Sequence, residues 1–303
     1  MAADRSDADT DTAADADTDA EADAMPDSAL LIRARGLWEA LADAPVSFAP
    51  SSEPTGPTGP TGRAGAAGAA GAARLAGTAG APGPAVVFSP TSALCPPSWA
   101  GIVVLGGAAI ATAPTESAAL VLRRALASVP VESLTRPEIV RAVLPVSDLL
   151  GPASLAYLSS AEFRPASHPQ GAAEPLASAH PDFQGLLRSA EPGDLAESGM
   201  EEITSPAFVV REGTDVVAAA GYRAWPAQTA HVCVLTHPRW RGRRLARHTS
   251  SAAVAHALAA GLLPQWRARP QASRRVARSL GFRELGSQLS VRLEVDALGG
   301  TLG

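Results

Sequence analysis

Two long stretches of this 303-residue chain are almost devoid of large apolar side chains and cannot build a hydrophobic core. Residues 1–27 consist largely of Asp, Ala and Thr, and residues 51–84 combine Pro-Thr-Gly triplets with Gly-Ala-Ala repeats. Such segments bury too little apolar surface to offset the conformational entropy lost on ordering. We therefore predict a disordered acidic tail at 1–27 and a flexible low-complexity insertion at 51–84, which together leave about 240 residues to fold.

The basic residues restrict the chemistry that the chain can perform. All 25 of them are arginine, because the sequence contains no lysine. This excludes Schiff-base catalysis, cofactors held as a lysine aldimine, and phosphate loops that depend on a lysine.

Charge is strongly segregated along the chain. Residues 1–28 carry ten acidic side chains and one arginine, whereas residues 239–283 carry eleven arginines and no Asp or Glu. The formal net charge of -5 hides this separation. A basic run of that density normally faces an anion, which can be a nucleic acid, a membrane or a phosphorylated ligand.

Other features favour a cytoplasmic protein without a membrane partner. The two cysteines, Cys95 and Cys233, are too few for a disulfide framework. The acidic N-terminus lacks the apolar core of a secretory signal, and the longest apolar stretch, 101–112, is too short to span a bilayer.

Residues 28–165, apart from the insertion, are predicted to form an N-terminal α/β region. The spacing of its leucines predicts a helix over 29–42. Apolar runs predict strands at 85–88 and 101–113, the second folded as a hairpin at Gly106-Gly107, and helices follow at 116–128 and 137–144. No chemical motif assigns a role to this region. It could be an acceptor-side domain, a degenerate second copy of the following fold, or a dimerisation element.

A Pro-, Ser- and Ala-rich stretch at 163–180 is the best domain boundary, and residues 166–303 are predicted to form the second domain. Its elements follow the order ααβββαβαβ. The predicted ranges are helices at 183–189 and 193–200, strands at 207–211, 216–222 and 230–236, a helix at 243–260, a strand at 263–267, a helix at 272–280 and a strand at 283–293.

The turn between the third strand and the long helix carries the clearest chemical signal. The strand ends before Pro238, and the helix begins within an arginine-rich segment. A helix N-terminus offers unpaired amides and a positive dipole end to an anion, while small residues at Gly242 and Ala246 permit close approach of a ligand. Arginines add bidentate phosphate donors, so the turn predicts a diphosphate site.

At these residues the sequence resembles the GCN5-related N-acetyltransferases, the GNAT superfamily, whose signature Gln/Arg-x-x-Gly-x-Gly/Ala follows a strand ending in x-x-Pro. The match reads Arg241-Gly242-Arg243-Arg244-Leu245-Ala246 and is supported by Leu280-Gly281-Phe282. The order of helices and strands also agrees with this family, so the resemblance covers about residues 165–295. It implies a GNAT-like α/β (α+β) fold, namely a mixed, mostly antiparallel sheet flanked by helices, preceded by the smaller α/β region.

The resemblance also implies an enzyme that moves an acetyl group directly from acetyl-CoA to an amine within a ternary complex. The strand at 230–236 would pair with the pantetheine arm, and the amide near Val234 would polarise the thioester carbonyl. The implied cofactor-binding residues are Val234, Thr236, Arg241, Gly242, Arg243, Arg244, Leu245 and Ala246.

Two positions depart from the family pattern. Arg244 replaces the central glycine of the signature, which crowds the backbone and adds charge. Many family members carry a tyrosine, as general acid, five residues before the Phe of Gly-Phe, and this place is Ala277. The acid is therefore unassigned.

A base must take a proton from the ammonium form of the acceptor. The candidate catalytic residues are His231, on the strand near the expected reaction centre, and Glu201 and Glu202, which precede the first strand of the domain. Each also has a structural interpretation, as a packed histidine or as solvated surface carboxylates. We expect no metal, because no second cluster of ligands accompanies His231, Cys233 and His237.

Two alternatives differ from acetyl transfer. A degenerate acyl-CoA-binding or interaction module would share the turn but lack catalysis, and a nucleic-acid binder would use the same arginines on phosphates. The second is disfavoured, because no aromatic ladder accompanies the arginines and the acidic tail would compete for them. The sequence indicates neither the acceptor nor the oligomeric state.

Overall fold

A computed structural model describes residues 25–48, 83–167 and 172–294. Most of the predicted tail and nearly all of the predicted insertion lie outside the described residues. The first helix, α2, spans Met25–Ala42 and therefore begins inside the range predicted as tail. It extends the predicted helix at 29–42 by four residues at its N-terminal end.

The described chain folds around one ten-stranded sheet with the order β1-β3-β2-β10-β4-β9-β8-β7-β6-β5. Only the β1–β3 and β8–β9 pairs are parallel, so the sheet is mixed and mostly antiparallel, and the predicted fold class is confirmed. The strands are β1 Ala85–Phe88, β2 Ala100–Leu105, β3 Ala108–Ala113, β4 Val146–Tyr157, β5 Glu174–Leu176, β6 Ala207–Glu212, β7 Asp215–Trp225, β8 Thr229–Thr236, β9 Leu263–Ala268 and β10 Arg283–Leu293. The helices after α2 are α3 Glu116–Leu126, α4 Pro137–Val143, α5 Pro181–Ser189, α6 Pro192–Ser198, α7 Leu245–Ala259 and α8 Gln271–Ser279.

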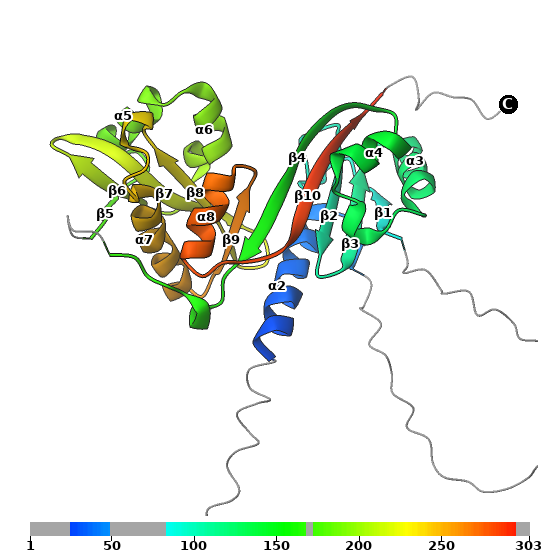
Figure 1. The fold of residues 1–303 in the computed structure, drawn as a ribbon, viewed down its shortest axis with the longest axis horizontal. Coiled ribbons are helices and arrows are strands. Elements are labelled where there is room, and N and C mark those ends of the chain that lie inside the picture. Colours follow the sequence, from blue (N-terminus) through cyan, green and yellow to red (C-terminus); the bar gives the residue numbers. More distant parts are fainter. Residues whose placement is uncertain (1–24, 49–82, 168–171, 295–303) are drawn as a thin grey trace, which may run out of the picture.

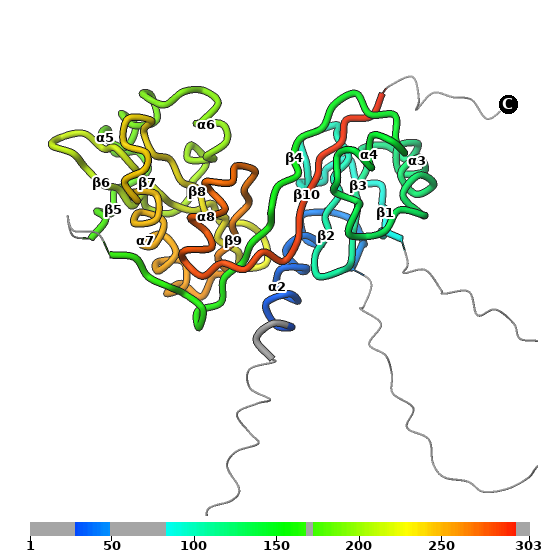
Figure 2. Tube along the Cα trace, viewed as in Figure 1, coloured from blue at the N-terminus to red at the C-terminus, as the bar shows by residue number. Residues whose placement is uncertain are grey.

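The sheet runs through two lobes that lie side by side (Figures 1 and 2). The N-terminal lobe holds β1–β4 with α2–α4, and the C-terminal lobe holds β5–β9 with α5–α8. The last strand, β10, pairs with β2 on one side and β4 on the other, so it lies inside the N-terminal lobe. The C-terminal lobe begins with β5, whereas the N-terminal lobe combines the first part of the chain with β10 from its far end.

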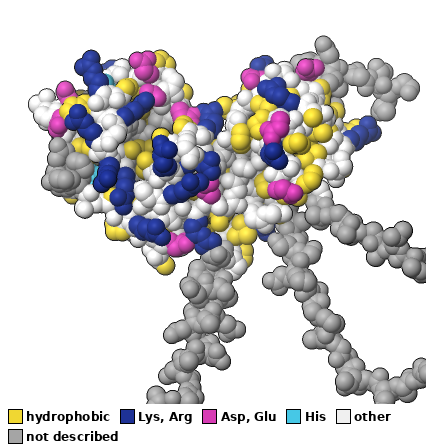
Figure 3. Space-filling view, viewed as in Figure 1, with side chains coloured by type: hydrophobic (Ala, Val, Ile, Leu, Met, Phe, Trp, Pro, Cys, Tyr) yellow, Lys and Arg dark blue, Asp and Glu magenta, His cyan; other side chains and the backbone are white. Residues whose placement is uncertain are grey.

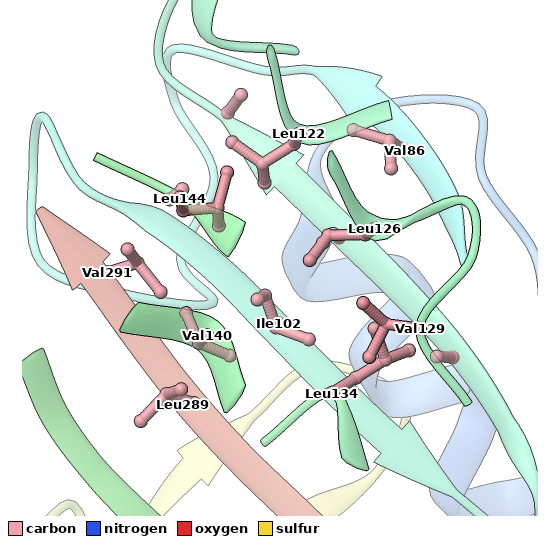
Figure 4. Close-up of a cluster of buried hydrophobic side chains, with 14 of the residues drawn as sticks. Val86, Ile102, Leu122, Leu126, Val129, Leu134, Val140, Leu144, Leu289 and Val291 are labelled. Carbon is pink, nitrogen blue, oxygen red and sulfur yellow. The ribbon is translucent and has the colours of Figure 1, made fainter. Parts of the chain in front are cut away.

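Helices cover both faces of the sheet in the N-terminal lobe. Helices α3 and α4 pack on one face through Leu122, Leu126 and Val140 against Ile102 and strand residues around it (Figure 4). Helix α2 packs on the other face, where Trp38 is fully buried. Its cluster reaches Leu263 of β9, so α2 also braces the junction between the lobes.

The C-terminal lobe is layered in the same way. Side chains alternate between the faces of a strand. On β8, Cys233 and Leu235 pack with Phe183 of α5, whereas Val232 packs with Val254 of α7 and with α8. Helices α5 and α6 thus lie on one face of the sheet, and α7 and α8 lie on the opposite face. None of the helices in the described ranges is long and apolar enough to cross a membrane.

The structure confirms the predicted hairpin and shows how α3 begins. The hairpin β2–β3 turns at Gly106-Gly107, both with positive φ. Thr115 caps α3, because its Oγ1 accepts a hydrogen bond from the amide of Ala118 at 3.1 Å. Strands β4 and β5 were not predicted. The first seven residues of β4 include Asp, Gly and Pro, which disfavour strands, and pairing with β10 compensates for this.

Candidate functional site

A cavity lies where β8 and β9 diverge. These parallel strands pair over only three residues, ending at His231↔Gln265. Beyond this pair β8 continues to Thr236 and β9 to Ala268, and residues of both stretches line a cavity of about 1350 Å³. The remaining walls come from α6, α8, the start of α7 and the N-terminal lobe. A cavity of this size can enclose a small-molecule ligand.

The turn from β8 into α7 leaves backbone amides without partners. Gly242 (φ 80°) and Arg244 (φ 62°) adopt the left-handed conformation, and a Cβ at Gly242 would meet nothing within 4 Å. Arg244 is the N-cap of α7 and makes no side-chain capping bond. The first amides of α7 therefore remain available to an anion at the positive end of the helix dipole.

Two buried polar atoms beside this turn lack a hydrogen-bond partner within the described ranges. They are Oγ1 of Thr236 and Nε of Arg247, and both residues line the cavity. Buried polar groups are almost always paired in folded proteins, so unpaired atoms at a cavity wall indicate a polar ligand. Together with the open space at Gly242, the residues of the turn fit a diphosphate.

Two carboxylates of α6 reach arginines on different walls of the cavity. Asp194 forms an ion pair with Arg241 of the turn, and Glu197 forms one with Arg269, which follows β9. Figure 3 shows further arginine side chains over the C-terminal lobe. A bound anion at the turn would compete with Asp194 for Arg241.

The structure brings most of the predicted cofactor-binding residues together. The cavity lining includes Val234, Thr236, Arg241, Gly242, Arg244, Leu245 and Ala246. The remaining residue, Arg243, lies with its guanidinium 4.4 Å from the centroid of the Trp240 ring and is not part of the lining. Helix α7 begins at Leu245, later than the predicted start at 243, because left-handed Arg244 cannot continue a right-handed helix.

His231 lies at the point where β8 and β9 separate. Its ring stacks on Trp225 at 4.0 Å between centroids, and its Nδ1 lies 2.6 Å from Oε1 of Gln265. An amide oxygen only accepts, so Nδ1 donates this bond and Nε2 carries the lone pair. Burial, followed by the charge of Arg267, lowers the pKa of His231 to about 3. The imidazole is therefore neutral at physiological pH.

The structure separates the two glutamate candidates. Both side chains are exposed, but only Glu202 lines the cavity, where it forms an ion pair with Arg223. Arg223 is the cross-strand partner of His231 on β7. His231 and Glu202 are thus held at the same end of the cavity through Arg223.

Comparison with known families identifies the lobe that contains the turn. Residues 205–287 match the family model described as GNAT acetyltransferase. The C-terminal part of this chain carries a GNAT domain. The match starts just before β6, ends within β10 and contains the whole β8–α7 turn. The description of that model names acetyl transfer as the activity of the family. No curated protein sequence matches the chain.

Solved structures similar to the chain include three proteins of the GNAT family. A putative acetyltransferase from Novosphingobium aromaticivorans is 24% identical over 48% of this chain and 65% of its own, with a TM-score of 0.39. A GCN5-related N-acetyltransferase from Kribbella flavida is 17% identical over 52% and 62%, with a TM-score of 0.39. An acetyltransferase from Colwellia psychrerythraea is 11% identical over 50% and 59%, with a TM-score of 0.37. The chain spans less than two thirds of each, and such similarities specify no substrate.

The N-terminal lobe supplies a wall of the cavity that the sequence did not predict. Gln288 and Ser290 of β10 line it, together with Leu150 of β4 and the segment 95–97. These residues belong to no motif, and they approach the GNAT domain only because β10 pairs with β4, which in turn pairs with β9. Arg223 and Arg267 were also missed, although both continue strands that lead into the predicted reaction centre.

The position of the usual general acid of the GNAT family holds no proton donor. Ala277 is buried among α8 and neighbouring apolar residues and is not part of the cavity lining. Within the described ranges, no group of three His, Cys, Asp or Glu side chains comes together as a metal site.

Proposed function

We propose that the protein is an N-acetyltransferase that moves an acetyl group from acetyl-CoA to an amine by direct transfer in a ternary complex. The observation that carries this proposal is the cavity between the diverging strands, with the unpaired amides of the turn at one end and His231 at the other. A long thioester ligand needs both parts, which are an anion site for its diphosphate and a slot between strands for its arm.

The turn would hold the diphosphate through the first amides of α7 and the guanidinium groups of Arg241 and Arg244. Thr236 Oγ1 and Arg247 Nε supply two further unpaired polar atoms beside it. The edge of β8 that β9 leaves free, around Val234, would bind the arm and orient the thioester carbonyl toward a backbone amide. Acetyl-CoA supplies the activated acetyl group, and no metal takes part.

The acceptor must lose a proton when its nitrogen attacks. A neutral His231 offers Nε2 as a hydrogen-bond acceptor that orients the amine, but with a pKa of about 3 it is a poor sink for the proton. Glu202, which lines the same end of the cavity, would take that proton directly or through water. Glu201 does not line the cavity and is therefore the weaker candidate for this role. With Ala277 in place of an acid, the leaving thiolate would be protonated by water.

The cavity also suggests a role for the first part of the chain. Residues 28–165, outside the insertion, would form an acceptor-side wall against the GNAT domain at 166–303. Cys95 and Cys233 both have free thiols, as is typical of proteins in the reducing cytoplasm.

Calorimetry and a thiol-release assay test the proposal. We expect acetyl-CoA and desulfo-CoA to bind at sub-millimolar concentration, and a panel of amines to release CoA. If neither acetyl-CoA nor desulfo-CoA gives a heat of binding, the acetyl-CoA site is refuted. Binding without CoA release from any amine favours the degenerate acyl-CoA-binding module, which the missing acid at Ala277 makes the second candidate. A salt-sensitive gel shift with random DNA would instead support nucleic-acid binding.

A further inference from the structure

We infer that the acceptor amine carries a carboxylate and that Arg267 binds it, so that the substrate class is a small amino acid. This inference rests on the proposed acetyl transfer and concerns the opposite end of the cavity from the diphosphate turn. Arg267 would be a specificity-determining residue that recognises the acceptor.

The charge balance at this end of the cavity singles out Arg267. Two arginines line it near His231, and only one has a carboxylate partner. Arg223 is paired with Glu202, whereas Arg267 forms no ion pair with any residue in the described ranges. Arg267 lies two positions beyond the last β8–β9 pair, on the same strand face as Gln265. Its side chain is exposed and lines the cavity.

Residues of β10 hold the guanidinium in place. Nη1 of Arg267 donates to Oε1 of Gln288 at 3.4 Å. The amide of Gln288 is itself oriented, because its Nε2 donates to the carbonyl of Leu94 and approaches Oγ of Ser290 at 3.4 Å. Gln288 is only 5% exposed, so its amide hydrogen-bonds to protein groups and not to solvent. The arginine is fixed by the neighbouring lobe while four of its five N–H donors remain for a ligand.

The charge of Glu202 favours the protonated form of Arg267, but the Glu202 carboxylate forms its ion pair with Arg223. Burial lowers its pKa, but a guanidinium stays protonated at any physiological pH. The ring of Trp225 lies 5.8 Å from its central carbon, at the outer limit of a cation–π contact. An exposed guanidinium on a cavity wall that has no ion-pair partner within the described ranges can bind an anionic ligand. A carboxylate matches the planar fork of the guanidinium with two parallel hydrogen bonds.

The position of the charge also limits the distance between carboxylate and amine. Arg267 lies close enough to His231 to contribute to the lowering of its pKa. Arg267 lies two positions along β9 from Gln265, the partner of His231, which is about 7 Å along a strand. A ligand that offers its amine to His231 and its carboxylate to Arg267 therefore has few bonds between them, as an α- or β-amino acid does.

Pairs of acceptors that differ only in charge test the inference. Glycine, β-alanine and the common L-amino acids would be compared with their amides in the CoA-release assay. We expect kcat/KM for the acids to exceed that for the amides by about 100-fold, because truncating a partner of a hydrogen-bonded charge pair typically has an effect of this size. In Arg267→Gln the preference should collapse to within a few-fold, while calorimetry shows unchanged acetyl-CoA binding. Arg188→Gln, on the exposed surface of α5, is the matched control and should keep the preference.

A second measurement separates this inference from the proposed function. N-acetylated amino acids and their amides would be titrated against the intrinsic fluorescence of the protein without acetyl-CoA, since Trp225 lies beside Arg267. Saturable binding of the acids, lost in Arg267→Gln, supports the carboxylate site even if acetyl transfer fails. Equal binding or turnover of acids and amides, no binding of any acid, or a preference that survives in Arg267→Gln overturns it.

Discussion

Replacing Gly242 with aspartate probes the diphosphate site at a position where a side chain meets open space. Gly242 has a φ of 80°, and a Cβ there has no neighbour within 4 Å. Gly242→Ala and Gly242→Asp therefore share the same backbone strain, about 1–2 kcal/mol for a left-handed residue. Only the aspartate adds a negative charge where the diphosphate would lie. The difference in acetyl-CoA affinity between the two variants therefore measures the electrostatic effect separately from the strain.

The expected size of the difference follows from Coulomb's law. At about 6 Å and an effective dielectric constant of about 40, each pair of unit charges repels by about 1.4 kcal/mol. Two charges on a diphosphate give about 3 kcal/mol, or about 100-fold in affinity. Because Gly242 is exposed, salt screening reduces this value, so we expect acetyl-CoA to bind Gly242→Asp 10- to 100-fold more weakly than Gly242→Ala at about 0.1 M salt.

Calorimetry at two salt concentrations measures this difference. Gly213→Asp is a matched control, because Gly213 has a φ of 62°, equally open space and a place in the β6–β7 hairpin outside the cavity lining. It should bind acetyl-CoA as the wild type does. Affinities of the Asp and Ala variants at Gly242 that agree within about twofold would show that the diphosphate does not lie at this turn.

Three further outcomes are expected. Asp194→Asn should raise the acetyl-CoA affinity measured by calorimetry up to about five-fold, because it frees Arg241 from a partly exposed ion pair. Weaker binding would contradict the idea that Asp194 and the bound anion compete for Arg241. Since burial lowers the pKa of His231 from its ordinary value of 6.5 to about 3, the unfolded state binds more protons between these values. Stability should therefore fall as pH drops from 6.5 towards 3, and denaturant melts of His231→Gln should show a shallower fall; an unchanged slope refutes the assignment. Leu122→Ala, at a fully buried site, should lose about 2–5 kcal/mol of unfolding free energy in the same melts, and a loss below 1 kcal/mol would contradict tight packing there.

The elements of the GNAT domain were predictable because each carries a local signal. Strand β8 ends at a proline turn, α7 ends before Gly261 with a φ of 73°, and the predicted range of β10 agrees with the structure. The helix start at Leu245 was harder to predict, because an arginine in the left-handed conformation is rare. The turn residues of the site were predictable for the same reason, since they are contiguous in sequence.

The acceptor end of the cavity could not be predicted from local patterns. Arg267 and Gln288 are 21 residues apart and meet only through the pairing of β4 with both β9 and β10. Strand β4 has no strand-like sequence in its first half, so the element that joins the lobes was itself missing from the prediction. Long-range pairing, rather than propensity, builds this wall.

The place of β10 has a consequence for biosynthesis. A nascent chain leaving the ribosome makes β2 and β4 early, but the strand that separates them spans Arg283–Leu293 and emerges last. Until then two strand edges in the middle of the first lobe stay open to other chains, and open edges promote aggregation. A product truncated after α8 would keep the complete β8–α7 turn and still lack the central strand of its first lobe.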